Sequence, residues 1–254
     1  MTFKIRDDYL ANRLQGDLTE ADLEEIFRIV DRTPEPTKTV LGYIGDISAL
    51  TILYDLDKQQ HLFGGYGVLS QLVSRFGDRI IPVWRGSDDI DMQGSRGVLN
   101  ALRSTYDVTN DRESPNLENK ITLKLGPKGN VDTAECKIDY TLMKDGDTFS
   151  EADVETIYVL GIPVRVATPS RLIKGKLEPA EHEESHFLDV LHMVGVLEHR
   201  KIGPGVLAYE LDREQKAKLY ELAKRYVLSE NGKRIDLGPS GRYLRELKDT
   251  LKRG

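Results

Sequence analysis

The chain has 254 residues and a net charge of −6, with 39% hydrophobic and 31% charged residues. This length and composition predict a soluble globular protein of one or two domains whose core needs no disulfides. The single cysteine, Cys136, is typical of a reducing, cytoplasmic location. No apolar run reaches the roughly 20 residues of a membrane span. The N-terminal residues are too charged for a secretory leader, and the acidic balance disfavours non-specific nucleic-acid binding.

The first third of the chain is predicted to be mainly helical. Apolar residues at helical spacing indicate a helix over 19–31, and a proline-containing linker follows at 33–36. The largely apolar stretch 40–56 fits either a helix or a strand. A further helix is expected over 68–76, where apolar residues again recur at helical spacing, and Gly77 ends it.

The middle of the chain carries the predicted strands. Residues 80–84 are expected to form a strand, and 89–92 either continue it or form the next one. Segments 120–125 and 133–142 flank a stretch rich in glycine, proline and asparagine, which predicts a hairpin. A third strand is expected over 158–166.

From Thr168 onward the pattern is helical, and Thr168-Pro169 is a typical helix start. The expected helices span residues 169–177, 179–198, 212–229 and 240–252. The predicted class is therefore α+β, with a mixed β-sheet and flanking helices over residues 1–167 and a C-terminal helical domain over 168–254.

Two carboxylates at the end of a predicted strand are the most informative feature. Asp89 and Asp91 are two residues apart, so on a strand their side chains share one face, about 7 Å apart. Two such oxygen ligands can share Mg²⁺. Gly64-Gly65 stands before a predicted helix, where a glycine backbone and helix amides favour phosphate. Each feature alone is also common in ordinary loops and turns.

A glycine turn, a helix and then Asp-x-Asp together resemble the nucleotidyltransferase superfamily. The segment Arg85-Gly-Ser87-Asp-Asp89-Ile-Asp91-Met92 is similar to the Arg-x-Ser/Thr-x-Asp-Ile-Asp-Leu pattern of AbiEii/MenT-type nucleotidyltransferase toxins. Asp89 follows Gly65 by 24 residues, a longer gap than is usual in that family. The resemblance covers about residues 60–192. It implies a nucleotidyltransferase-like sheet, with nucleotide binding by the residues Gly64, Gly65, Arg85 and Ser87.

The resemblance also implies a third carboxylate on a neighbouring strand, which would bind metal with Asp89 and Asp91 and assist the reaction. Asp139 is the best candidate, because by alternation it faces away from the apolar side of its strand. An ordinary exposed strand aspartate fits the pattern equally well. Three other acids in turn-like surroundings are weaker candidates: Asp107, Asp111 and Asp132.

After the last strand, toxins of this type carry a helical lysine and then a helix with an Asp-x-x-Asp-Leu-like pattern. By this resemblance Lys176 contacts the nucleotide triphosphate, with Lys174 as the alternative, and Asp189 braces the nucleotide site. His186 stands where that family usually has an aspartate, so this second motif is only half matched. A helical lysine is otherwise more often a solvated side chain.

His182-Glu-Glu-Ser-His186 offers a competing interpretation. On a helix, His182 and His186 would lie one turn apart and could bind Zn²⁺, with Glu183 as general base, as in a metalloprotease. His192 would be a third ligand. The crowded glutamates around this motif favour a solvated helix face instead.

The resemblance implies transfer of a nucleoside monophosphate from an NTP to an acceptor hydroxyl, with Mg²⁺ or Mn²⁺ as cofactor. It further suggests tRNA 3′ ends as acceptor and a cognate antitoxin as partner. The lack of a long apolar run predicts no membrane association. Besides the zinc protease, a catalytically inactive protein that binds nucleotide or a partner remains an alternative.

Overall fold

The computed structural model covers residues 1–254. It describes residues 37–81, 84–113, 119–127, 135–144, 149–150, 152–194, 207–225, 228–230, 233–235 and 242–254, together with a few isolated residues between 21 and 33. The helix expected over 19–31 therefore lies largely outside the described residues.

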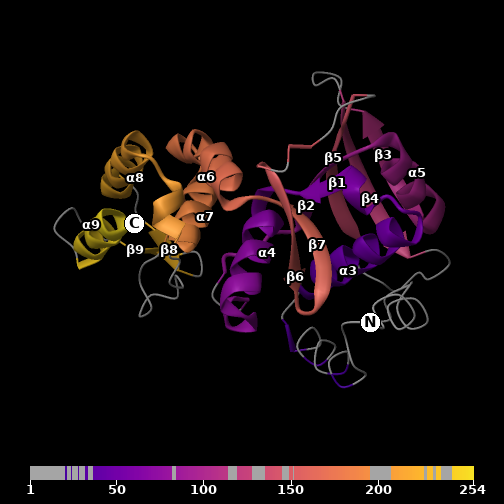
Figure 1. Ribbon diagram of the computed structural model, residues 1–254, viewed down its shortest axis with the longest axis horizontal. Helices are drawn as coiled ribbons and strands as arrows, with labels where there is room; N and C mark the ends of the chain where they lie inside the picture. Colours follow the sequence, from indigo (N-terminus) through magenta and orange to yellow (C-terminus); the bar gives the residue numbers. More distant parts are fainter. Residues whose placement is uncertain are drawn as a thin grey trace. The chain divides into compact units, whose positions relative to one another are not determined.

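The chain divides into two compact units (Figure 1). The first comprises Met1–Ile81 and Gly86–Ala167, and the second comprises Pro82–Arg85 and Thr168–Gly254. The short segment Pro82–Arg85 thus belongs with the C-terminal part of the chain, although it immediately precedes the predicted carboxylate motif.

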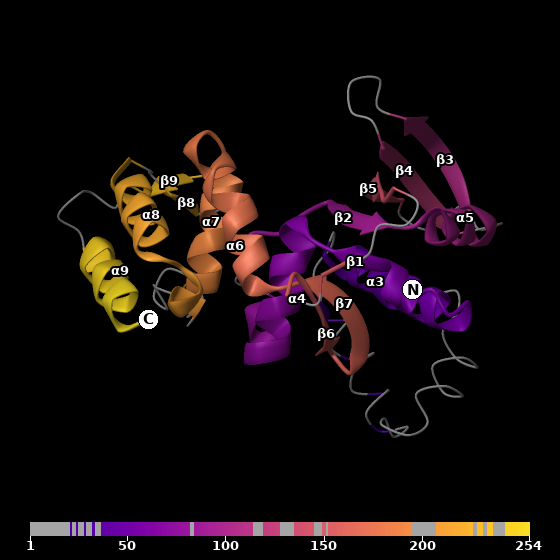
Figure 2. The ribbon, with the colours of Figure 1, turned by 45° about the horizontal axis from the view of Figure 1, so that its top comes forward.

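A mixed seven-stranded sheet in the order β3-β4-β5-β2-β1-β7-β6 organises the first unit. Its strands are β1 (Gln60–Leu62), β2 (Asp89–Gly94), β3 (Tyr106–Glu113), β4 (Lys120–Pro127), β5 (Cys136–Leu142), β6 (Val154–Val159) and β7 (Ile162–Ala167). Strand β2 pairs in parallel with β5 and antiparallel with β1. Figure 2 shows β3, β4 and β5 on one side of β2 and the β1-β7-β6 part of the sheet on the other.

Three helices pack against this sheet: α3 (Thr37–Leu53), α4 (Gly64–Phe76) and α5 (Arg96–Thr105). Helix α4 ends as the sequence predicts, because Gly77 adopts a left-handed conformation and its N–H donates to the carbonyl of Val73. Helix α5 begins at Ser95, whose hydroxyl accepts from the Val98 N–H. The ambiguous stretch 40–56 proves to be largely helical.

Two strand predictions in the first unit are wrong. The described residues of 80–84 contain the end of a 3₁₀ turn (Asp78–Ile80) and a bend, and no strand. The single strand expected over 158–166 is a hairpin of β6 and β7. Leu160 and Gly161 form its two-residue turn, both with positive φ. Such turns favour glycine or asparagine at both positions, so Leu160 concealed the turn.

The second unit contains α6 (Pro169–Leu177), α7 (Glu184–Val194), α8 (Arg213–Arg225) and α9 (Arg242–Arg253). Its buried side chains are mainly leucines and other apolar residues of these helices, including Ile173, Phe187 and Leu247. Helix α6 spans the predicted residues 169–177 and starts with Pro169 at its first turn, where the absent N–H needs no partner.

The purely helical pattern expected after Thr168 is wrong in one place. Strands β8 (Leu228–Glu230) and β9 (Lys233–Ile235) form a small hairpin where a helix was expected to reach residue 229. Asn231-Gly232, which stands between them in the sequence, is a dipeptide favoured in such turns.

The predicted fold class is confirmed: the protein is α+β, with a mixed sheet flanked by helices and a largely helical C-terminal part. None of the described helices combines the length and the apolar character that crossing a bilayer requires.

Candidate active site

The two predicted carboxylates lie together on the central strand of the sheet. Asp89 and Asp91 are half-buried on one face of β2, while Ile90 and Met92 point to the other face and are fully buried. The alternation of polar and apolar residues therefore places both acids on one side, as a strand requires. The hydroxyl of Ser87 donates to Asp89 Oδ1 over 2.9 Å and orients this carboxylate.

The glycine turn lies directly against the second carboxylate. Gly64 begins α4 with a φ of +63°, and a Cβ at this position would overlap the carboxylate of Asp91. The backbone N–H of Phe63 also donates to the Asp91 carbonyl over 3.0 Å. Only glycine meets both demands, because the left-handed conformation and the close approach each exclude a side chain. The sequence-predicted residues Gly64 and Asp91 are thus brought into contact.

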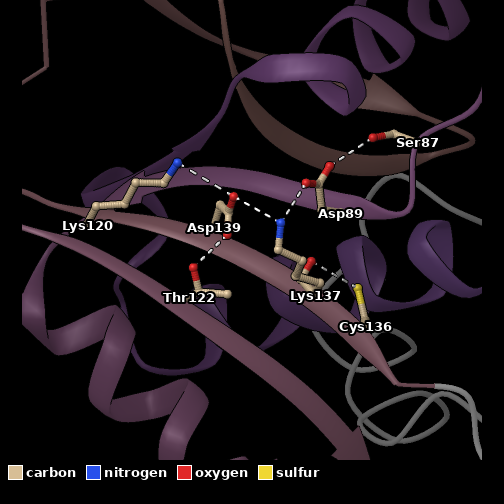
Figure 3. A network of polar contacts seen from close by, with 7 residues as sticks. All are labelled: Ser87, Asp89, Lys120, Thr122, Cys136, Lys137 and Asp139. Carbon is tan, nitrogen blue, oxygen red and sulfur yellow. Dashed lines mark hydrogen bonds and ion pairs between the residues drawn. The ribbon is translucent and has the colours of Figure 1, made fainter. Parts of the chain in front are cut away.

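Strand β5 adds two further charged side chains to the same face (Figure 3). In the parallel register Asp91 is opposite Asp139, and Asp89 is opposite Lys137. The Lys137 ammonium donates to Asp89 Oδ2 over 3.1 Å and to Asp139 Oδ2 over 3.2 Å. The lysine therefore lies between the first predicted carboxylate and the third.

Asp139 has two more partners on β4. The hydroxyl of Thr122 donates to Asp139 Oδ1 over 2.9 Å, and Lys120 Nζ lies 3.6 Å from Asp139 Oδ2 (Figure 3). Partial burial would raise the pKa of Asp139, but the hydrogen bonds from Thr122 and Lys137 and the two lysine charges outweigh burial and lower it. This carboxylate is therefore held in its ionised form.

Lys137 is charged for the complementary reason. Its partial burial disfavours the ammonium, yet the hydrogen bonds and negative charges of Asp89 and Asp139 prevail and raise its pKa. Neither Lys137 nor Thr122 was predicted as a site residue. Alternation could have found Lys137, because a residue two positions before Asp139 on a strand must share its face.

The described residues contain no group of three or more histidine, cysteine, aspartate or glutamate side chains arranged to hold a metal ion, and Asp89, Asp91 and Asp139 together are no exception. Cys136, next to Lys137, points to the opposite, buried face, and burial raises the pKa of its thiol to about 12. The polar face of β2 and β5 therefore carries both carboxylates and an ammonium group, and the Lys137 ammonium contacts Asp89 and Asp139.

Three predicted site residues, Arg85, Lys176 and Asp189, lie in the second unit. Arg85 binds Asp189 through two hydrogen bonds of 2.8 Å, from Nε to Oδ1 and from Nη2 to Oδ2. Lys176 Nζ contacts Asp189 Oδ2 over 2.6 Å. Asp189 and Lys176 are buried, whereas Lys174, on the same helix, is exposed. Two cations thus surround one fully buried anion.

The helix that the zinc-protease interpretation requires does not form. Helix α7 begins at Glu184, and His182 ends the preceding 3₁₀ turn, so His182 and His186 do not lie one turn apart on a helix. His186 instead contacts Glu183 through Nε2 over 3.1 Å, and its Nδ1 lies 3.5 Å from Lys176 Nζ. His192 is buried, and burial lowers its pKa to about 4.

No protein-family model matches the sequence, and no curated protein matches it. Solved structures with some likeness include ANT(2″)-Ia in complex with adenylyl-2″-tobramycin, at 15% identity and a TM-score of 0.45 over 75% of this chain and 99% of that one. An antigenic nucleotidyltransferase-like protein from Paracoccidioides brasiliensis has 14% identity and a TM-score of 0.47, over 87% and 94%. JHP933 from Helicobacter pylori has 16% identity and a TM-score of 0.40, over 92% and 90%. Because every TM-score is below 0.5, none of these likenesses supports a function for this chain.

Proposed function

We propose that the protein is a metal-dependent nucleotidyltransferase that transfers a nucleoside monophosphate from an NTP to an acceptor hydroxyl. The observation that supports this most is the contact between Gly64 and Asp91. It joins the glycine turn at the start of α4 to the Asp89-x-Asp91 strand, and these are the two halves of the motif that resembles this class of enzyme in sequence.

The donor set of β2 fits a divalent cation. Asp89 and Asp91 offer carboxylate oxygens on one half-exposed face, and such oxygens are the ligands that Mg²⁺ and Mn²⁺ take. When bound, the cation would neutralise charge on the triphosphate and on the leaving pyrophosphate. The first amides of a helix have no intrahelical acceptor, so Gly64 and Gly65 are proposed to donate to phosphate oxygens.

In the proposed reaction a bond forms between the acceptor oxygen and the α-phosphorus, and the bond from this phosphorus to the bridging oxygen breaks, releasing pyrophosphate. The hydroxyl proton leaves to a base, for which Asp139 was the predicted candidate. The hydrogen bonds and lysines that lower the pKa of Asp139 make it a weaker base than an ordinary aspartate. Positioning and charge neutralisation would then contribute most of the rate enhancement.

The second unit supplies the remaining proposed contacts. Lys176 and Arg85 together carry one more positive charge than Asp189 neutralises. We propose that this charge attracts the triphosphate and that Asp189 holds the two cations in place. Helix α9 carries exposed basic residues, among them Arg245, Lys248 and Lys252. These residues support a tRNA 3′ end as the proposed acceptor. A toxin role with a cognate antitoxin is proposed on the sequence resemblance alone.

The proposal is tested by incubating the protein with Mg²⁺, total RNA and each of the four α-labelled NTPs. The readouts are pyrophosphate release and label transfer. Asp89→Asn and Asp91→Asn should each reduce both on the order of a thousandfold, because each removes a ligand charge from the metal. Asp88→Asn is the matched control, since Asp88 is exposed beside them and should be dispensable.

Mg²⁺-dependent NTP binding without pyrophosphate release would favour the inactive binding protein instead. Equal activity of wild type, Asp89→Asn and Asp91→Asn would contradict the proposed role of β2.

A further inference from the structure

The position of Lys137 bears on how many metal ions the proposed site can hold. Its ammonium lies 3.1 Å from Asp89 Oδ2 and 3.2 Å from Asp139 Oδ2, so it bridges two carboxylates that project from neighbouring strands (Figure 3). A cation shared by these two carboxylates would have to occupy the same space. The lysine is therefore already a cation at the place where a second divalent ion would bridge them.

The backbone explains why the ammonium lies there. Lys137 is opposite Asp89 in the parallel β2–β5 register, and Asp139 follows it by two residues on the same face. The lysine thus reaches one carboxylate across the strands and the other along its own strand. Its side chain is only 39% exposed, and both distances lie within the ordinary range of N–H···O hydrogen bonds.

The balance of charges on this face also disfavours a second divalent ion. Three aspartates on this face, Asp89, Asp91 and Asp139, are accompanied by the ammonium groups of Lys137 and Lys120. The lysines offset two of the three negative charges, so one divalent cation already reverses the local balance. A second divalent cation would then meet both a positive neighbourhood and an occupied position.

We propose that Lys137 is a built-in substitute for a second divalent ion, so that the site binds a single ion through Asp89 and Asp91. This inference rests on the proposed function. In this inference Asp139 positions the Lys137 ammonium and does not bind the metal directly. The covalent chemistry of the proposed transfer is unchanged, and only the source of the second positive charge differs.

The test counts Mn²⁺ ions bound to the full chain by the loss of the free-Mn²⁺ electron paramagnetic resonance signal. The Asp89→Asn/Asp91→Asn double variant serves as the blank for non-specific binding. Above this blank, wild type should bind one ion and Lys137→Gln should bind two, whereas Lys137→Arg, which keeps the charge, should again bind one. Adding Asp139→Asn to Lys137→Gln should return the count to one, because it removes the newly freed ligand.

Lys124→Gln is the matched control. Lys124 is opposite Lys137 across the β4–β5 register, but it forms an ion pair with Glu135, which is not one of the three aspartates, so this variant should bind one ion. Circular dichroism and thermal unfolding establish that each variant is folded.

Two ions on wild type, or a single ion on Lys137→Gln, would overturn the inference and leave the proposed metal site intact. If wild type bound no more Mn²⁺ than the blank, the proposed function would fail, and the inference with it.

Discussion

Two carboxylates of this protein have lysine partners but lie in opposite surroundings. Asp139 in the first unit is 14% exposed and contacts Lys137, which is 39% exposed. Asp189 in the second unit has no exposed area, and its partner Lys176 is 6% exposed. The chemistry of the two pairs is similar, so the difference lies in how much water reaches them.

This difference indicates how much each ion pair contributes to stability. At a half-exposed face water solvates and screens both charges, so the ion pair of Lys137 and Asp139 contributes little. Water does not reach a fully buried pair, so removing one member leaves the charge of the other uncompensated. We therefore interpret the β2–β5 face as the reactive surface and the Arg85–Asp189–Lys176 cluster as a rigid clamp of the second unit.

The largest expected effect comes from breaking the clamp. Asp189→Ala leaves the buried ammonium of Lys176 without its anion, and it should lower the free energy of unfolding by about 3–5 kcal/mol. Chemical denaturation monitored by circular dichroism measures this. Glu181→Ala, which removes an exposed ion pair with Lys218, is the control and should leave stability nearly unchanged. Similar losses in the two variants would contradict the view that burial makes the clamp more important for stability than an exposed ion pair.

The pH dependence of stability tests how burial in the second unit affects a charged group. His192 is buried near Asp189 and Arg85. Burial lowers its pKa from the usual 6.5 to about 4, with Asp189 opposing this decrease and Arg85 adding to it. Between these values the unfolded chain binds a proton that the folded chain does not. Stability that is complete above pH 6.5 is therefore lost as the pH falls toward 4, by on the order of 3 kcal/mol.

His192→Gln removes this titration, so its unfolding free energy should fall less than that of wild type between pH 7 and pH 4.5. Parallel pH profiles for the two proteins would show that folding leaves the pKa of His192 unchanged and would contradict this prediction.

The smallest expected change in stability tests the reactive face. Gly64→Ala forces a side chain into a left-handed conformation and against the Asp91 carboxylate, which should cost about 1–3 kcal/mol. It should also abolish Mg²⁺-dependent pyrophosphate release, because the carboxylate must move. Gly175→Ala is the control, since a Cβ there meets nothing within 4 Å. Normal activity in Gly64→Ala would show that the glycine turn is not part of the active site.

Local patterns were sufficient for much of the first unit. Alternation along 89–92 and 136–139 predicted which residues face the core, and the structure has the same faces. Gly77 marked the end of α4 because a left-handed residue after a helix favours glycine. By contrast, the turn at Leu160 escaped notice because a leucine with positive φ contradicts its own local preference.

The sequence by itself determined that Asp89 and Asp91 share a face, since alternation on a strand depends only on neighbouring residues. It also indicated a glycine pair at the start of a predicted helix, and the structure has Gly64 and Gly65 as the first residues of α4. Only the tertiary structure decided that Lys137 lies between Asp89 and Asp139 and that Gly64 touches Asp91. Those contacts depend on which strands become neighbours and in what register, and strand pairing is set by interactions between residues far apart in the chain.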